Sequence, residues 1–482
     1  MGVATGRMIR SVARTFALLA LLLPVCAAAA QDTQTQPQPS SPVSLMLQQA
    51  LQFAIDHYPT VRAALEQVNA STAGVSVAKS AYLPRLDSLW QSNRGTANNI
   101  FGQVLPQSAI PAMSGPVLTS ASGGSVWGSA TGALFSWEPF DFGLRQATVV
   151  SAEAAVTRAR AAEALTRLDV QTAVGTAFLN IVGAQRAVAA LQADVDRRDL
   201  LSRAVHTLVD NQLRPGAEAS RSDAERAAAQ TRLIQAQQAV AVAQITLARV
   251  LGVTSGSVAI DATTLVDRVP TDVPTAPTTT HPLTQFRQAT VDVARAQEHV
   301  LSRTDLPHVY FQSSVFARGS GANANGQLDG GLSGLGLDRA NWAAGVQVVF
   351  PNAFDYTSLR ARKAAAAASA RAESALYDEA VLTVTSQQQE AAAMVQAARA
   401  VAANTPVQLA AARQSEAQAT ARYQAGLASI VEVADAQGLL AQAEVQDQLA
   451  RIDVWRALFA QAVAQGTLAP FVALITPATG GR

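Results

Sequence analysis

The sequence predicts a mainly α-helical protein that carries a small membrane β-sheet and is built from two similar halves. Three observations support this fold class: a long internal repeat, helical stretches far longer than those of globular proteins, and four strand-like segments rich in tryptophan. Phe140-Asp141 returns as Phe354-Asp355, 214 residues later. Because solenoid repeats recur every ~20 to 50 residues, a period of this length indicates a duplicated half-molecule.

The repeat includes the helices that open each half. Pro59 and Pro84 bracket a helical stretch in the first half, and Pro282 and Pro307 bracket one in the second, with the same spacing of 25 residues. We therefore expect a signal peptide at 1–30, a flexible segment at 31–43, a first structural repeat at 44–253, a linker at 254–280, a second structural repeat at 281–467 and a C-terminal tail at 468–482.

The first 30 residues have the form of an export signal. Three arginines between positions 7 and 14 precede the apolar stretch Thr15–Val25, and Ala28-Ala29-Ala30 offers small residues for cleavage. The apolar stretch is shorter than the ~20 residues of a membrane-spanning helix. Lipidation of Cys26 is the alternative to simple cleavage. Since Cys26 is the only cysteine, no disulfide or cysteine-based metal site is expected in the exported part.

The composition does not indicate an enzyme or a nucleic-acid-binding protein. The net charge of +1 suggests no nucleic-acid partner. The five histidines are scattered, and His57 and His281 stand at repeated positions where helices begin, which favours a structural role. The glycine-rich segment 330–336 lacks the dinucleotide-binding pattern. We predict no catalytic residues, no cofactor and no metal site.

The predicted helices are too long to pack into a globule. No proline interrupts Leu144–Val209, and a helix of that length would extend roughly 100 Å. Apolar residues follow in steps of four and three from Val170 to Val195, which is the heptad pattern of a coiled coil. The stretch from Val384 to Leu409 repeats this pattern with smaller residues, and Leu233–Val250 has its own seam. An ordinary helical bundle is the alternative. Pro406 should bend the second long helix without ending it.

Four segments of about ten residues have the character of membrane strands. They contain four of the five tryptophans, and Trp342–Phe350 alternates large apolar residues with small or polar ones. The expected strands are Leu86–Asn93, Ser125–Trp137, His308–Ala317 and Trp342–Phe350. An open strand edge is not tolerated in lipid, so membrane insertion would require oligomerisation. A soluble β-layer at the end of a helical stalk is the alternative.

Two further segments resemble the periplasmic tips of the TolC family of outer-membrane efflux proteins. Arg422–Ser429 and Glu432–Gln437 are similar to the tip signature of that family, and residues 212–218 repeat it in degraded form. The resemblance covers the whole exported part of the chain. It implies a homotrimer in outer-membrane lipid, with a twelve-stranded β-barrel that continues as a periplasmic coiled-coil α-barrel. It also implies a periplasmic adaptor protein and an inner-membrane transporter as partners.

The resemblance further implies roles for residues near the two tips. The periplasmic entrance would be lined or locked by Glu218, Tyr423, Glu432 and Asp435. The tips that dock the adaptor would contain Gln212, Leu213, Gly426, Leu427, Ala428 and Ser429. Two positions depart from the family pattern: Ala428 stands where the prototype has a locking arginine, and Arg221 is the counterpart of Asp435. The closed-state lock must therefore be built differently, or be weaker.

A local explanation competes for Glu432. Ser429 and Glu432 have the spacing of a capping box, in which the glutamate satisfies backbone donors at a helix start. Capping and pore lining are compatible. The function that the resemblance implies is the exit duct of a tripartite efflux system for small molecules. Alternatives are the exit duct of a type I protein secretion system and a trimeric coiled-coil stalk or adhesin.

Overall fold

The computed structural model describes residues 44–96, 98, 105, 107–110, 123–253, 258–266, 280–323, 325, 327–351 and 356–475. The expected signal peptide, the flexible segment and most of the linker lie outside these residues. All of the described residues belong to one compact unit, Ser41–Arg482.

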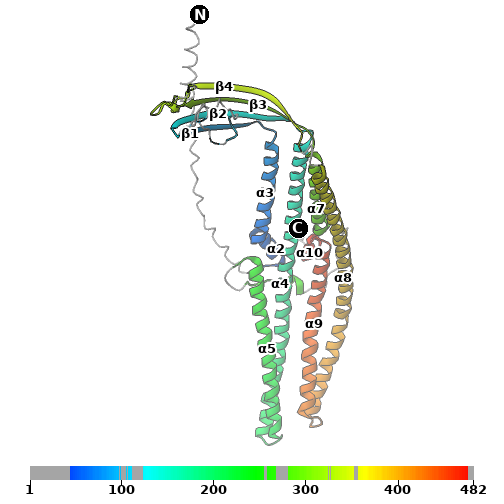
Figure 1. The fold of residues 1–482 in the computed structure, drawn as a ribbon. Coiled ribbons are helices and arrows are strands. Elements are labelled where there is room, and N and C mark those ends of the chain that lie inside the picture. The colour runs from blue at the N-terminus through cyan, green and yellow to red at the C-terminus, as the bar shows by residue number, and fades with distance from the viewer. Residues whose placement is uncertain are drawn as a thin grey trace, which may run out of the picture. The chain divides into compact units, whose positions relative to one another are not determined.

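Two sets of helices repeat the same plan, as the duplication predicts (Figure 1). In each set a helix that begins with proline leads to the sheet, a very long helix leaves the sheet, and a shorter helix returns along it. The first half contains α2 (Leu47–His57), α3 (Pro59–Ser80), α4 (Leu144–Asp210) and α5 (Gly216–Leu251). The second contains α7 (Pro282–Arg303), α8 (Tyr356–Gln424) and α9 (Ile430–Ala464), with the short α6 (Thr263–Val266) and α10 (Ala469–Ile475) beside them.

Local sequence signals set several of these helix boundaries. Proline occupies the first helical position of α3 and of α7, where its missing N–H costs nothing. The His281 ring accepts a hydrogen bond from the Leu283 amide and so caps α7. Gly252 ends α5 in the left-handed conformation, with φ of 75°. Pro406 lies inside α8, which continues through it as expected.

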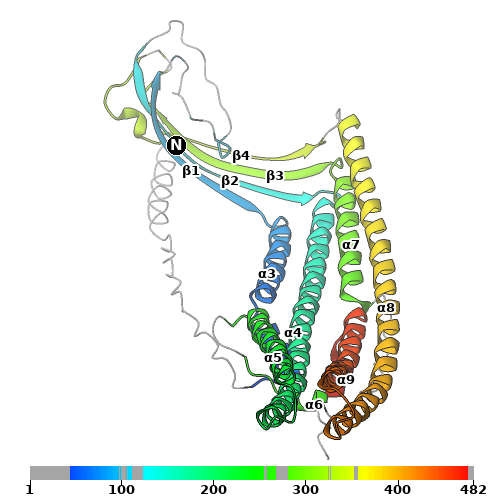
Figure 2. The same cartoon turned by 90° about the horizontal axis from the view of Figure 1, so that it is seen from below.

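The four strands form one antiparallel sheet in the order β1-β2-β3-β4. The strands are β1 (Arg85–Thr96), β2 (Ser125–Phe140), β3 (His308–Ser320) and β4 (Arg339–Val349), close to the predicted segments. The sheet is curved, and its two outer strands β1 and β4 each have a neighbour on one side only (Figure 2). Among the described residues, neither edge of the sheet has a further strand beside it.

The register separates the side chains of the sheet into two faces of different character. The apolar face contains Leu86, Trp90, Phe135, Phe311, Val315, Trp342 and Val346. The polar face contains Asp87, Gln91, Gln312, Ser314, Arg318, Arg339, Asn341 and Gln347. Trp90 and Trp342 on the apolar face are 73% and 78% exposed in the single chain. This alternation is that of a membrane strand with one face toward lipid and the other toward an aqueous interior.

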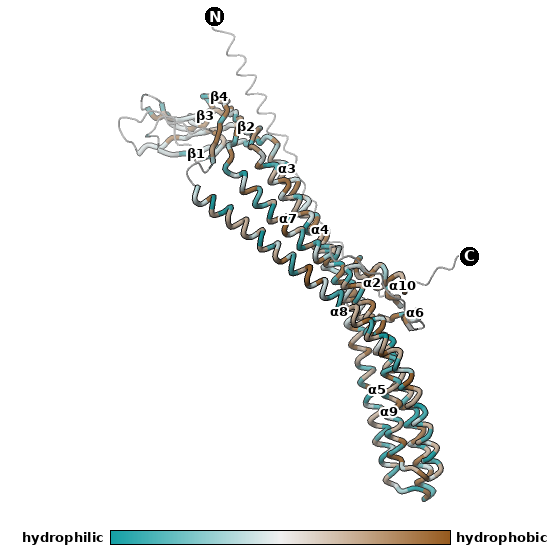
Figure 3. The backbone as a smooth tube through the Cα atoms, turned by 90° about the vertical axis from the view of Figure 1, so that its right-hand side faces the viewer, coloured by the Kyte–Doolittle hydropathy of each residue, from teal (hydrophilic) through white to brown (hydrophobic). Residues whose placement is uncertain are grey.

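The main core lies midway along the helices, where α2, α4, α9 and α10 meet. Trp455 and Phe459 of α9 pack edge-on against Phe471 of α10, with ring centroids 6.0 and 5.3 Å apart. Residues 468–482, expected as a tail, thus include a helix that completes this core. Along the long helices apolar and polar residues alternate in short steps, as heptad packing requires (Figure 3).

The heptad seams are buried as predicted only in part. In α8 the positions Val384, Ala391, Val395 and Leu409 are buried. In α4 the apolar seam is buried from Val170 to Ile181, but nearer the tip polar residues take over the buried positions. Asp194 and Arg198 are fully buried there and form an ion pair at 3.0 Å. The predicted continuation of the seam to Val195 is therefore only half-buried.

A close approach of α4 and α9 leads to a first prediction. Gly175 of α4 lies directly against the ring of Phe459, and a Cβ at this position would overlap that ring. Because Phe471 holds the ring from the other side, Gly175→Ala should destabilise the protein by about 1–3 kcal/mol through overpacking. Thermal unfolding followed by circular dichroism measures the effect.

Gly74 provides the matched control, because it is also a helical glycine but no neighbouring atom lies within 4 Å of the place that a Cβ would occupy. Gly74→Ala should leave stability unchanged or raise it by about 0.5–1 kcal/mol, from helix propensity alone. Equal unfolding temperatures for the two variants would contradict the close packing of α4 against α9.

Candidate functional site

The two helical hairpins end in the same turn at the end of the molecule opposite the sheet (Figure 1). Gln212 and Gly426 occupy equivalent positions and both adopt the left-handed conformation, with φ of 59° and 74°. The following leucine amides close each turn: Leu213 donates to the Leu208 carbonyl at 2.9 Å, and Leu427 donates to the Arg422 carbonyl at 2.8 Å. These are Schellman-type helix ends, in which a residue with positive φ reverses the chain.

Each turn exposes its leucine. Leu213 is 68% exposed and Leu427 is 71% exposed, and Gln212, Gly426 and Ser429 are also on the surface. Ala428 differs, because its side chain is buried against Tyr423 and Val433. The predicted tip residues are therefore brought together at one end, but Ala428 is excluded from the surface that they form.

A cluster of three side chains joins the two hairpins behind these turns. The Tyr423 hydroxyl donates to the Glu218 carboxylate at 2.7 Å. The Arg214 guanidinium donates to the Tyr423 carbonyl at 3.0 Å and lies over the Tyr423 ring, 4.6 Å from its centroid. Arg214 also lies 3.8 Å from Glu218. Arg214, Glu218 and Tyr423 are hereafter called the tip linkage.

Burial of Tyr423 keeps the hydroxyl of the tip linkage protonated over a wide pH range. Tyr423 is 4% exposed and packs in a small apolar cluster with Val205, Ile430 and Val433. Burial, followed by the hydrogen bond to Glu218, raises the pKa of Tyr423 to about 12. The phenol therefore stays protonated and remains a donor at every physiological pH.

Arg214 is the residue that sequence reasoning missed. The resemblance implied that Ala428 stands where the prototype has a locking arginine, and the structure places the guanidinium of Arg214, from the other hairpin, against Tyr423. The signal in the sequence was weak: an arginine before Pro215, in a turn that repeats the tip motif in degraded form. Only the contact across the two hairpins reveals its partner.

The remaining predicted entrance residues lie at the start of α9. Glu432 completes the capping box with Ser429, as the local explanation expects, and lies 3.7 Å from Arg422. Asp435 is exposed one turn further along. Arg221, the counterpart of Asp435, pairs with Glu225 at 3.7 Å. The structure thus shows that the charge of Glu432 is partly offset by an arginine.

A second polar cluster lies further up the same helices. Arg198 is 3% exposed and binds Asp194 on its own helix and Glu225 of α5, at 3.0 and 3.1 Å. Asp223 accepts hydrogen bonds from His206 and Ser202, which lower its pKa. Removing one partner of a buried ion pair is strongly destabilising. These residues therefore fix the pairing of α4 with α5.

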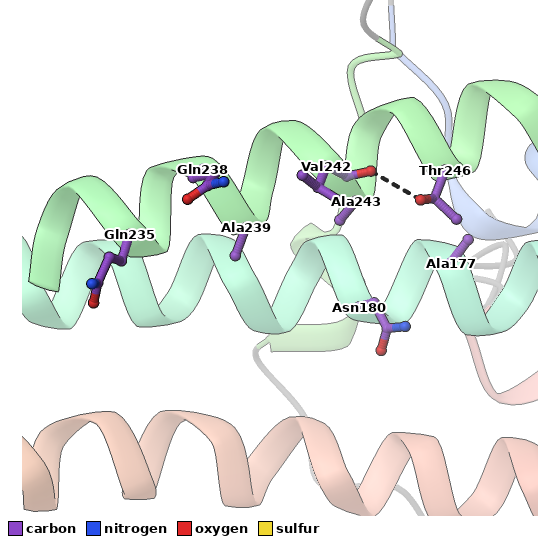
Figure 4. Close-up of a pocket in the computed structure, with 8 residues that line it drawn as sticks. All are labelled: Ala177, Asn180, Gln235, Gln238, Ala239, Val242, Ala243 and Thr246. Atoms are coloured by element: carbon purple, nitrogen blue, oxygen red, sulfur yellow. Dashed lines mark hydrogen bonds between the residues drawn. The ribbon is translucent and has the colours of Figure 1, made fainter.

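A shallow groove between α4 and α5 is one of the hollows among the helices (Figure 4). It has a volume of about 400 Å³ and is lined by small residues and amides, among them Ala177, Asn180 and Gln238. Its one hydroxyl, that of Thr246, donates to the Val242 carbonyl of its own helix. The lining contains no acid, base or free nucleophile, so the groove does not present catalytic chemistry. No cluster of possible metal ligands occurs among the described residues.

The fold and the tip together define a class of protein: a membrane channel subunit with a β-sheet for the outer membrane and a long helical periplasmic part. The family model for outer membrane efflux proteins matches residues 50–253 and 282–462, most of both repeats. The chain belongs to the outer membrane efflux protein family, as its resemblance to TolC proteins predicted. It is an outer-membrane protein with a long periplasmic helical domain.

Solved structures of similar fold agree with this assignment. The outer membrane protein VceC of Vibrio cholerae has a TM-score of 0.69 and 17% identity, over 87% of this chain and 96% of that chain. The CmeC outer membrane channel of Campylobacter jejuni has a TM-score of 0.71 and 15% identity, over 87% and 85%. The MtrE outer membrane channel of Neisseria gonorrhoeae has a TM-score of 0.65 and 17% identity, over 90% of this chain and 94% of that chain. No curated protein sequence matches the chain.

The tip linkage can be tested by a distance measurement. Spin labels on Leu213→Cys and Leu427→Cys report the separation of the two turns, since the chain has no cysteine after residue 30. Tyr423→Phe should lengthen and broaden the distance distribution, because the bond to Glu218 is lost. Between pH 7 and about 10 the wild-type distribution should not change, because the raised pKa keeps Tyr423 protonated and its bond is lost only as pH passes through about 12.

Tyr377→Phe is the control for this experiment, since it makes the same change on the same helix away from the tips. A Tyr423→Phe distribution identical to that of Tyr377→Phe would show that the hydroxyl does not hold the hairpins together.

Proposed function

We propose that this chain forms a homotrimeric channel that serves as the exit duct of a tripartite efflux system for small molecules. The observation that carries the proposal is the open sheet with an apolar face, joined directly to helices that are far too long for a compact core. Strands β1 and β4 leave their outer hydrogen-bonding groups unpaired within the chain. In lipid those groups must be satisfied by other copies, β4 of one chain pairing with β1 of the next.

Three copies account for both parts of the chain. Twelve strands make a closed barrel whose apolar face meets lipid and whose polar face lines an aqueous passage. The helices that continue from the strands then extend the passage through the periplasm. The exposed apolar side chains on the long helices, such as Ile245 and Leu382, are covered by neighbouring copies in this arrangement.

The exposed tip turns are the surface that we assign to a periplasmic adaptor protein, which in turn would connect to an inner-membrane transporter. They lie at the periplasmic end and present the apolar side chains Leu213 and Leu427 together with backbone groups. A type I protein secretion system would use the same fold and the same surface. The two functions differ in cargo. Drug hypersensitivity of a strain that lacks the channel would indicate efflux, whereas loss of a secreted protein would indicate the secretion duct.

The docking role of the tips leads to a specific prediction. Gly426→Pro removes the positive φ that the turn needs, and Leu427→Asp places a charge on the exposed apolar tip. Each should abolish efflux, measured as drug hypersensitivity of cells that depend on this channel. Trimer formation and outer-membrane insertion should be retained, because neither residue packs in the core.

Leu332→Asp is a matched control, since Leu332 is 66% exposed in the β3–β4 connection at the other end of the molecule. It should leave efflux unchanged. Normal drug resistance and normal protein secretion in the Leu427→Asp and Gly426→Pro strains would mean that the tips do not dock the adaptor. Normal drug resistance together with loss of a secreted protein in these strains would favour the secretion duct.

The entrance carboxylates lead to a second prediction. In three copies Glu218, Glu432 and Asp435 place nine carboxylates near the periplasmic opening, and acidic rings favour cations. Glu218 and Glu432 each contact an arginine, whereas Asp435 is exposed. Asp435→Asn should therefore reduce the preference for potassium over chloride more than Glu432→Gln, and the double variant should reduce it further.

Reversal potentials of single channels in planar bilayers measure this preference. Asp56→Asn on α2, away from the tips, is the control. An ion preference that is the same in the double variant and in wild type would show that these carboxylates do not face the lumen.

A further inference from the structure

The polar face of the sheet carries two arginines directly opposite each other. In the register, Gln91, Ala130, Arg318 and Arg339 form one row across all four strands. Like charges directly opposite on neighbouring strands repel each other and destabilise a sheet. Arg318 and Arg339 lie near the strand ends farthest from the helices, so this unfavourable pair is placed at the outer end of the polar face.

Two donors in this row are buried without a partner among the described residues. The Nε of Arg318 lacks a hydrogen-bond acceptor, although this side chain is nine-tenths buried. The Nε2 of Gln91 is buried and lacks an acceptor as well. Buried polar atoms in folded proteins are nearly always paired, so two orphaned donors beside two like charges require an explanation.

Part of the β1–β2 connection lies over the same row. The Leu105 amide donates to the Gln91 side-chain oxygen at 3.2 Å, and Ile110 packs against Ala130 and Phe316 of the polar face. These contacts place the segment over the Gln91 and Ala130 end of the row, whereas Arg339 at the sheet edge is exposed. Arg318 is nine-tenths buried, and burial strengthens the attraction between its guanidinium and an anion.

We propose that Arg318 and Arg339, with the Gln91 amide, form a binding site for the carboxylate or sulfonate group of an anionic organic solute on the inner wall of the barrel, near its outer opening. An anion beside the two guanidinium groups reduces their repulsion and accepts hydrogen bonds from the orphaned donors of Arg318 and Gln91. The inward direction of the polar face rests on the trimeric channel proposed above. Three copies would then provide six arginines around the exit, as in pores that favour anions.

The proposed arginine site lies at the opposite end of the duct from the acidic entrance, and this position suggests a role in export. The acidic entrance attracts cationic groups, whereas the arginines at the exit attract acidic ones. A solute with both kinds of group meets a complementary site at each end of the duct. The arginine pair would also favour acidic cargo over purely cationic cargo at the last step of export.

Direct binding of an anionic dye tests the site without requiring transport. The probe is 8-hydroxypyrene-1,3,6-trisulfonate, and its fluorescence anisotropy is measured with the detergent-purified oligomer. Arg339→Gln and Arg318→Gln should each weaken binding by about tenfold or more. Because Arg339 is exposed, Arg339→Gln tests the site even if the buried Arg318 proves necessary for folding.

Arg94→Gln is the matched control. Arg94 lies near the same end of the sheet but on the apolar face, where it donates to Ser125 and lies 6.0 Å from the Trp127 ring centroid. Its removal should leave dye affinity unchanged. An effect of Arg94→Gln equal to that of Arg339→Gln would place the bound anion on the lipid side, as a lipid phosphate would be, and would refute the internal site.

The site is also refuted if wild type does not bind the dye at millimolar concentration, or if both arginine variants bind it as wild type does. These outcomes are independent of the proposed duct. An oligomer that confers drug resistance but does not bind the dye refutes the anion site alone. A monomer that binds the dye through both arginines refutes the duct and retains the site.

Discussion

The constraint on which the rest of the structure depends is that a β-sheet in lipid cannot keep an open edge. The described residues contain four strands, and their order leaves β1 and β4 with a neighbour on one side only. In the trimer that we propose, closure comes from identical copies, and identical copies impose rotational symmetry on everything attached to the strands. The helices then repeat around the same axis. A heptad seam along such helices holds each pair together, while their remaining apolar side chains are available to the next copy.

The sequence predicts most of this architecture because its signals are long or repeated. Helices of nearly 70 residues are far longer than the helices of globular proteins. Proline at the first helical position marks the start of α3 in the first half and of α7 in the second. Strand positions follow from alternation and tryptophan. The limits appear where tertiary contacts overrule a local pattern. The α4 seam continues in the sequence to Val195, but buried Asp194 and Arg198 occupy the interface there, and Arg198 also pairs with Glu225 of α5.

The candidate site shows the same division between local and long-range information. The two turns could be located from the tip motif because a left-handed residue and an exposed leucine are local requirements. Arg214 could not be assigned, because its partner Tyr423 is 209 residues away in the sequence. The resemblance to the TolC family implies that Ala428 stands where the prototype has a locking arginine. In the structure, the guanidinium that lies against Tyr423 comes from Arg214 of the opposite hairpin.

The duplication places two similar hairpins side by side at the tip, so residues of both can contribute to the tip linkage. The halves have diverged in charge while they keep their backbone turns, as the same Schellman-type ends at Gln212 and Gly426 show. Backbone geometry is constrained by the need to reverse a helix in a few residues, and only residues that tolerate positive φ satisfy it. The charge of each side chain near the tips is less constrained, because it has to be balanced only within the group of residues that contact one another. The two ends of the duct can therefore acquire opposite charge, with carboxylates near the tips and arginines on the polar face of the sheet, without any change in the fold that carries them.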